Sequence, residues 1–226
     1  MSSITTWDWW GSPTNWDTPA GMLLRRFFDS LPAGREYRFT LYGSAPLQLT
    51  LNRAWLSADV DFFSDEDEDA NQWVHAAGLA KEQADFYLEP GFRLSFRATA
   101  VMKERARLER LGSVTVTIPH PLDILIGKLD RLSEKDLLAF RRVMDLTGHP
   151  TREEFLRELQ NAVDLFRPAF DEESPNRYPE NAVRLWRELW QADLDVRRDI
   201  IAPALARRRA GYGETPPDYK RVLREC

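Results

Sequence analysis

The chain has 226 residues, a single cysteine and a formal net charge of −5 at pH 7. One cysteine excludes an internal disulfide and zinc sites built on cysteine pairs, and a negative net charge excludes attraction of nucleic acid by the molecule as a whole. No apolar run approaches the roughly 18 residues of a membrane helix, and the first residues lack the basic and apolar regions of a signal peptide. We expect a globular cytoplasmic protein with no membrane contact, in which any RNA or nucleotide meets a local basic patch.

Residues 1–17 form a Trp-rich N-terminal segment that holds four of the eight tryptophans. Tryptophan rings bury large apolar areas, so we expect this segment to pack on the rest of the domain or on a second subunit. From residue 18 to about 120, apolar runs alternate with turn residues, which predicts an α/β core. Its first expected elements are a helix over 18–30, a strand over 37–42, a short helix over 45–51 and a strand over 57–63.

Asp59 and Asp61 lie one residue apart in the second expected strand. Side chains two residues apart on a strand point to the same face, so these two carboxylates repel each other unless a cation lies between them. Mg²⁺ suits such a pair, because it binds one or two carboxylates together with substrate phosphates. Gly43, just before the short helix, lets backbone N–H groups approach a phosphate. The alternative is that the acids lie on a solvated strand face and that Gly43 is an ordinary turn residue.

This order of apolar strand, Gly43-Ser44, short helix and Asp-Val-Asp-Phe strand resembles the nucleotidyltransferase superfamily that includes DNA polymerase beta. The resemblance implies that Gly43 and Ser44 hold the β- and γ-phosphates of a nucleoside triphosphate. It also implies that Asp59 and Asp61 bind Mg²⁺ as catalytic residues. Fourteen residues separate Ser44 from Asp59, slightly more than is usual in the family.

Two further residues extend the resemblance, and one position departs from it. Arg53 and Ser57 stand where bacterial members often carry Arg and Ser or Thr ahead of the acids, so both are expected to bind nucleotide. Active members usually add a third carboxylate from a later strand. We expect that strand at residues 92–96, where Ser95 is central. Asp85 and Glu89 are nearby substitutes for the third carboxylate, but they lie outside the expected strand.

The remaining pattern predicts a change from mixed to helical structure. Residues 85–97 are expected to form strands or a hairpin, and residues 99–111 a charged helix or a long polar segment. Alternation of Val and Thr over 113–118 predicts a strand. From Pro121 onward we expect helices over 121–132, 133–146, 151–166 and 180–209, the last of them broken near Pro203. The predicted class is therefore α/β (α+β), with a small mixed β-sheet core over 18–120, flanked by helices, and an all-helical region over 121–226.

A second group of charged residues begins the helical region. Lys128 and Arg131 are three residues apart and share a helix face, and Lys135 and Asp136 fall in the first turn of the next helix. The segment resembles one found in bacterial nucleotidyltransferase-like proteins of the abortive-infection toxin type. That resemblance implies that Lys128, Arg131 and Lys135 bind nucleotide and that Lys128 and Asp136 take part in catalysis. The alternative is an ordinary amphipathic helix with a solvated charged face.

These features favour a Mg²⁺-dependent nucleotidyltransferase that moves a nucleotidyl group from a nucleoside triphosphate to a hydroxyl of an RNA, such as tRNA, or of a protein. The resemblance implies a toxin that is encoded beside a neutralising antitoxin protein. The competing hypothesis is a catalytically degenerate module that binds nucleotide or a protein partner, which Ser95 in place of an acid favours. Binding of Mg²⁺ and triphosphate without release of pyrophosphate would distinguish the second hypothesis from the first.

Overall fold

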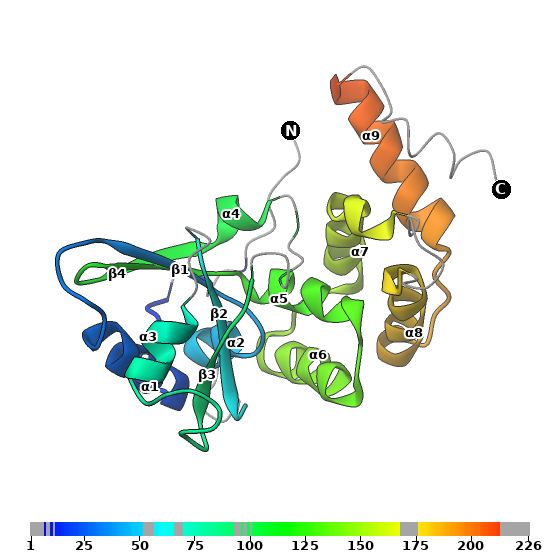
Figure 1. Cartoon of the computed structure of the whole chain (residues 1–226). Helices are drawn as coiled ribbons and strands as arrows, with labels where there is room; N and C mark the ends of the chain where they lie inside the picture. Colours follow the sequence, from blue (N-terminus) through cyan, green and yellow to red (C-terminus); the bar gives the residue numbers. More distant parts are fainter. Residues whose placement is uncertain are drawn as a thin grey trace. The chain divides into compact units, whose positions relative to one another are not determined.

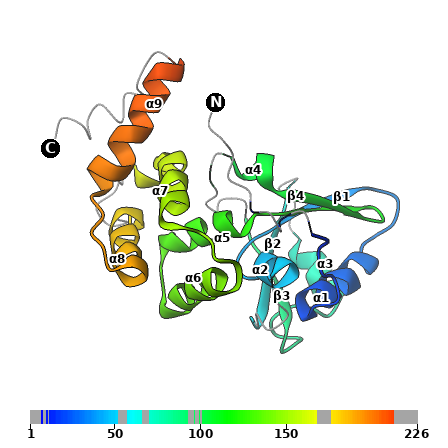
Figure 2. The same ribbon diagram turned by 180° about the vertical axis from the view of Figure 1, so that it is seen from behind.

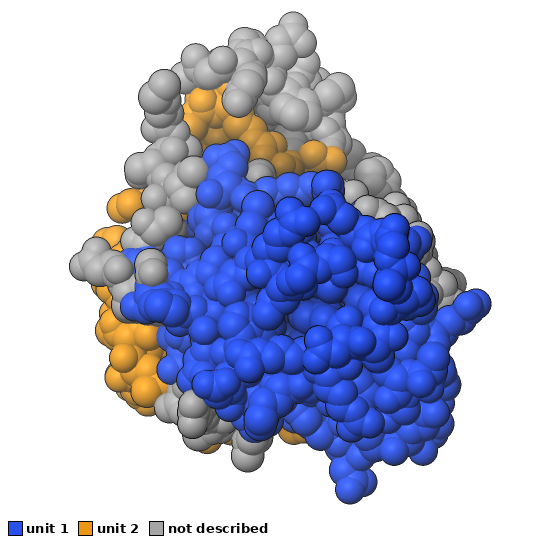
Figure 3. Space-filling model, turned by 90° about the vertical axis from the view of Figure 1, so that its left-hand side faces the viewer, with its two compact units in different colours: residues 1–96, 101–124 blue, residues 97–100, 125–226 orange. Residues whose placement is uncertain are grey.

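Residues of the N-terminal half fold around a five-stranded mixed sheet, and those of the C-terminal half form helices, as the sequence predicted (Figure 1). The computed structural model describes residues 7, 10, 12–51, 57–65, 70–92, 96, 99, 101–167 and 176–212. Two compact units divide the chain: Met1–Phe96 with Val101–Ile124, and Arg97–Ala100 with Leu125–Cys226 (Figure 3). Within the described residues, no helix is long and apolar enough to cross a membrane.

The elements of the first unit alternate between strands and short helices. They are α1 (Pro19–Asp29), β1 (Tyr37–Leu41), α2 (Ala45–Thr50), β2 (Asp59–Ser64), α3 (Asn71–Ala76), β3 (Tyr87–Pro90), α4 (Met102–Arg105), β4 (Arg107–Leu111) and β5 (Val114–Ile118). The strand order is β3-β2-β1-β5-β4. The β1–β5 and β2–β3 pairs are parallel, whereas the β1–β2 and β4–β5 pairs are antiparallel.

The core of this unit lies between one face of the sheet and helices α1 and α3 (Figure 2). Helix α1 begins at Pro19 because Thr18 caps it, accepting a hydrogen bond from the Gly21 N–H at 3.1 Å. Its Phe27 packs on Phe62 of β2, with the ring centroids 5.4 Å apart. Since Val60 and Phe62 both face this core, the intervening residues of β2 face the other side of the sheet.

The Trp-rich segment packs on the same chain, which was one of the two expectations for it. The indole N–H of Trp16 donates to the Glu109 carboxylate at 2.7 Å, and that of Trp10 donates to the Arg105 carbonyl at 2.9 Å. The Arg107 guanidinium lies 4.5 Å from the centroid of the Trp10 ring. Helix α4 and strand β4 therefore hold Trp10 and Trp16.

The expectation of a helix or polar segment over residues 99–111 is wrong for its second half. Among the described residues of this range, Met102–Arg105 alone is helical, and Arg107–Leu111 is strand β4, paired antiparallel with β5 through a turn at Gly112. Gly112 has φ +60°, a conformation that suits the tight turn between two antiparallel strands. The sheet thus gains an edge strand in which Arg107 and Glu109 are half-buried and Leu108 and Arg110 are exposed.

Helix α5 (Pro121–Gly127) crosses from the first unit to the second, and the elements after it are helical. They are η3 (a 3₁₀ turn, Lys128–Asp130), α6 (Glu134–Thr147), α7 (Arg152–Asn161), η4 (a 3₁₀ turn, Val163–Phe166), α8 (Tyr178–Trp190), η5 (a π-helical segment, Val196–Ile201) and α9 (Ala202–Tyr212). Capping boxes start α6 at Ser133 and α7 at Thr151, at the starts expected for the helices over 133–146 and 151–166.

The last long helix is interrupted earlier than expected. Helix α8 ends where Gln191 adopts a left-handed conformation, φ 49°, and the break is not at Pro203. Pro203 is the second residue of α9, directly after the π-helical segment η5, and the helical backbone continues through it. Helix α7 contacts the π-helical segment η5 that precedes α9, because the side-chain amide of Gln160 donates to the Asp199 carbonyl at 2.6 Å.

Candidate functional site

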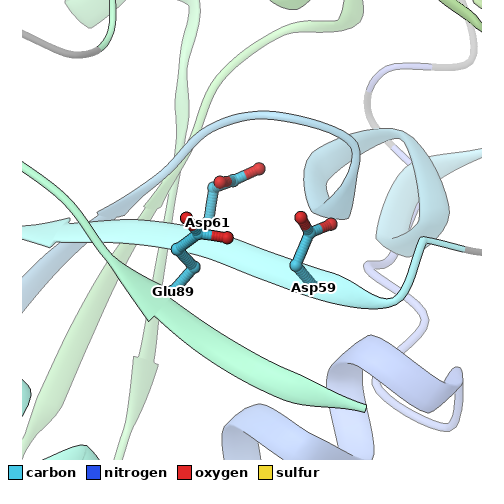
Figure 4. A group of neighbouring side chains, drawn as sticks. All are labelled: Asp59, Asp61 and Glu89. Carbon is cyan, nitrogen blue, oxygen red and sulfur yellow. The ribbon is translucent and has the colours of Figure 1, made fainter. Parts of the chain in front are cut away.

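Asp59 and Asp61 extend from the same face of β2, as their spacing predicted (Figure 4). Both side chains are half-buried, whereas Val60 and Phe62 between and beyond them are fully buried in the core on the opposite face. The core residues fix the orientation of the strand, because a shift of register by one residue would turn the acids into the core.

A third carboxylate, that of Glu89, joins these two from the neighbouring strand. β3 runs parallel to β2, and its register places Glu89 beside Asp61. Ligand oxygens of Asp59, Asp61 and Glu89 all lie within 4.8 Å of one another (Figure 4). We refer to these three residues as the acidic triad. Carboxylate oxygens at this spacing can hold a hard divalent cation such as Mg²⁺.

The expectation that Glu89 lies outside the relevant strand is therefore wrong. The strand that pairs with β2 is Tyr87–Pro90, and Phe92 lies beyond its end. Ser95 lies outside the described residues. The signal for Glu89 was an acid directly after the short apolar run Phe86–Leu88, but its position beside Asp61 depends on the parallel register between β2 and β3. Sequence alone does not fix that register, because no short turn joins parallel strands.

Gly43 lies against the Asp61 carboxylate in the loop between β1 and α2. Its φ is +63°, and a Cβ built on it would stand 1.8 Å from Asp61 Oδ2. The preceding residue is tied to the same strand, since the Tyr42 N–H donates to the Asp61 carbonyl at 3.0 Å. The loop thus passes directly beside the acidic triad, and only glycine leaves room for the carboxylate at this position.

Three other residues, Ser44, Arg53 and Ser57, were predicted to bind nucleotide near the acids, and the structure describes two of them. Ser44 precedes α2 and its carbonyl accepts from the Gln48 N–H at 3.2 Å, so it stands at the start of that helix. The Ser57 hydroxyl donates to Asp59 Oδ1. Arg53 lies outside the described residues. Ser44 and Ser57 are half-buried, and their contacts with a nucleotide stay predictions.

Lys128, Arg131 and Asp136 converge in the second unit. The Lys128 ammonium donates to Asp136 Oδ1 at 2.9 Å, and Arg131 Nε lies 3.2 Å from Asp136 Oδ2. The side chain of Asp136 is only 1% exposed and that of Lys128 11%, whereas that of Arg131 is 72% exposed. Lys135 is exposed on α6. The predicted roles of these residues in nucleotide binding and catalysis stay predictions.

The environment of Asp136 keeps it ionised. Burial by itself would raise the pKa of this carboxyl, but the hydrogen bond and positive charge of Lys128 act in the opposite direction. Ser133 adds its hydroxyl and backbone N–H as donors at 2.6 Å and 2.9 Å. Together these partners lower the pKa of Asp136 from 3.8 to about 2. Asp136 therefore fixes the position of the Lys128 ammonium at the start of α6.

Comparison of the chain with protein-family models, curated proteins and solved structures gave no match.

Proposed function

We propose that the protein is a Mg²⁺-dependent nucleotidyltransferase whose active site is built on the acidic triad. The observation that carries the proposal is the placement of three carboxylates from β2 and β3 beside the Gly43 loop. A solvated strand face would explain each acid alone. It does not explain why a glycine with φ +63° leaves space for one of their oxygens.

The residues present fit Mg²⁺. This ion takes oxygen ligands, and it is commonly held by one or two carboxylates together with substrate phosphates. Asp59 and Asp61 would hold it, with Glu89 as the third carboxylate beside them. When bound, the ion would supply charge neutralisation for the triphosphate and for the acceptor oxygen.

The chain's own groups have separate tasks in the proposed reaction. Backbone N–H groups of the Gly43-Ser44 loop, at the start of α2, bind the β- and γ-phosphates. The oxygen of an acceptor hydroxyl forms a bond to the α-phosphorus while the bond from that phosphorus to the bridging oxygen breaks, and pyrophosphate leaves. Glu89, the exposed member of the acidic triad, accepts the hydroxyl proton. Most of the rate comes from positioning and charge neutralisation.

The acceptor and the biological role follow from the resemblance to abortive-infection toxins. We propose that the acceptor is a hydroxyl of RNA, such as tRNA, or of a protein, and that an antitoxin protein neutralises the activity. A cytoplasmic location would give access to nucleoside triphosphates and to these acceptors.

A transfer assay tests the proposal. The full chain is incubated with Mg²⁺ and each nucleoside triphosphate labelled at the α-phosphate, with total tRNA or with the protein alone as acceptor. We expect label in the acceptor and an equal amount of released pyrophosphate. Asp61→Asn should abolish both while leaving the melting temperature close to that of the wild type. Asp85→Asn, at an exposed acid outside the acidic triad, is the matched control and should keep full activity.

Two outcomes would contradict the proposal. Transfer that persists in Asp61→Asn would place the chemistry elsewhere. Binding of Mg²⁺ and triphosphate by the wild type, with no pyrophosphate released on any acceptor, would favour the nucleotide-binding module without catalytic activity.

A further inference from the structure

We propose that Ser57 is a positioning residue for the Asp59 carboxylate and does not contact the nucleotide. Ser57 lies two residues before Asp59, and its hydroxyl donates to Asp59 Oδ1. This inference rests on the proposed function, because it concerns the same acidic triad. It replaces the nucleotide-binding role that the resemblance implied for Ser57.

The hydrogen-bonding capacity of serine supports this assignment. A hydroxyl carries a single hydrogen, so Ser57 cannot donate to a phosphate oxygen while it donates to Asp59. The hydroxyl oxygen can still accept, but phosphate oxygens are acceptors themselves. A contact with the triphosphate would therefore require Ser57 to give up its bond to Asp59.

Asp59 needs such a donor more than Asp61 does. Asp61 is held against Gly43, and its backbone carbonyl accepts from Tyr42. Asp59 is the first residue of β2, and its carboxylate lies near two others of the same charge. Like charges favour rotation of a carboxylate away from its neighbours. A hydrogen bond to Oδ1 opposes that rotation and leaves the remaining lone pairs of the carboxylate for a cation.

The test measures cation binding in the absence of nucleotide. Mn²⁺ is titrated into the full chain and followed by calorimetry, for the wild type and for Ser57→Ala, Ser57→Thr and Ser57→Val. We expect Ser57→Ala to raise the Mn²⁺ dissociation constant about tenfold, the usual effect of removing a partner of a metal ligand. Ser57→Thr keeps the hydroxyl and should bind like the wild type. Ser57→Val has nearly the shape of threonine without the hydroxyl and should bind like Ser57→Ala.

Two controls separate this effect from a loss of folding. Ser113→Ala removes an exposed hydroxyl in the turn between β4 and β5 and should leave Mn²⁺ binding unchanged. Melting in EDTA reports whether each variant folds without the cation. If Ser57→Ala does not fold, the Mn²⁺ affinities of Ser57→Thr and Ser57→Val test the inference instead. These two variants differ only in that threonine carries a hydroxyl where valine carries a methyl group.

The outcomes distinguish this inference from the proposed function. Equal Mn²⁺ affinity in Ser57→Thr and Ser57→Val would overturn it, and weaker binding of ATP by Ser57→Val alone would then assign Ser57 to the nucleotide. In that case the proposed function would stand. A wild-type chain that binds no Mn²⁺ would overturn both proposals.

Discussion

Gly43 and Asp61 lie so close that a Cβ on the glycine would stand 1.8 Å from the Asp61 carboxylate oxygen. The two residues come from different elements, the β1–α2 loop and strand β2. No substitution at Gly43 can keep both the loop and the carboxylate in place. This contact joins the proposed phosphate-binding loop to the proposed cation ligands.

Replacing Gly43 by alanine tests that contact, and the chain offers a matched control. Gly43 and Gly112 have nearly the same φ, +63° and +60°, but a Cβ on Gly112 meets no atom within 4 Å. Both alanine variants should lose about 1 kcal/mol of stability from the left-handed conformation. Only Gly43→Ala should also displace Asp61 and lose Mn²⁺ binding. Thermal melting in EDTA and Mn²⁺ calorimetry check this, and equal cation binding by the two variants would contradict it.

Removing one charge from the acidic triad should separate stability from cation binding. With three carboxylates within 4.8 Å, neutralising Glu89 relieves repulsion between like charges. We expect Glu89→Gln to raise the melting temperature slightly in EDTA. The gain in unfolding free energy should stay below about 1 kcal/mol, because Glu89 is exposed. The rise in melting temperature that Mn²⁺ gives the wild type should shrink in this variant. Asp85→Asn should show neither change, and an unchanged response to Mn²⁺ in Glu89→Gln would exclude Glu89 as a ligand.

The acids of β2 could be predicted because strand alternation is local. Val60 and Phe62 are apolar, so the same four residues give both the buried face and the face that carries Asp59 and Asp61. Glu89 could not be predicted in the same way. Its place beside Asp61 is set by the pairing of β2 with β3, which more than twenty residues separate along the chain. The capping boxes at Ser133 and Thr151, by contrast, need only four consecutive residues each.

Strand β4 is a second case in which contacts distant in sequence decide the structure. Its sequence, Arg-Leu-Glu-Arg-Leu, has the charges of an exposed helix and no strong strand alternation. In the structure, Arg107 and Glu109 meet the N-terminal segment, where Trp16 donates to Glu109 from 93 residues away along the chain. Contacts of that separation override local propensity, and a window of neighbouring residues does not contain them.

The buried ion pair between Arg105 and Asp123 should be costly to break. Its guanidinium donates to both carboxylate oxygens, at 2.7 Å and 2.6 Å, and both side chains are 0% exposed. Asp123→Asn leaves a buried guanidinium without its counter-charge, and we expect a loss of about 3–5 kcal/mol in urea unfolding. Replacing both partners, as Arg105→Met with Asp123→Leu, should cost less than the single change. A double variant less stable than Asp123→Asn would contradict this account.

Lys128 and Arg131 contact the same carboxylate but differ in exposure, so their removal should differ in cost. Lys128→Met leaves buried Asp136 without its closest cation, and we expect a loss of about 2–3 kcal/mol. Arg131→Ala removes a cation whose side chain is 72% exposed, and its cost should stay below about 1 kcal/mol. Chemical unfolding at neutral pH measures both changes. Similar losses in the two variants would indicate that Lys128 is not the principal partner of Asp136.

The lowered pKa of Asp136 predicts a specific loss of stability in acid. Its pKa is about 2 in the folded chain and near 3.8 without its partners, so the unfolded state binds the proton more readily. The ionised carboxylate therefore contributes about 2 kcal/mol of stability that is fully present above about pH 4 and is lost as the pH falls toward 2. Asp136→Asn cannot show this dependence, so its difference in unfolding free energy from the wild type should shrink between neutral pH and about pH 3. Glu134→Gln, at an exposed acid in the same turn of α6, should differ little from the wild type at either pH. A difference between wild type and Asp136→Asn that stays constant over this range would show that the charge of Asp136 does not stabilise the fold.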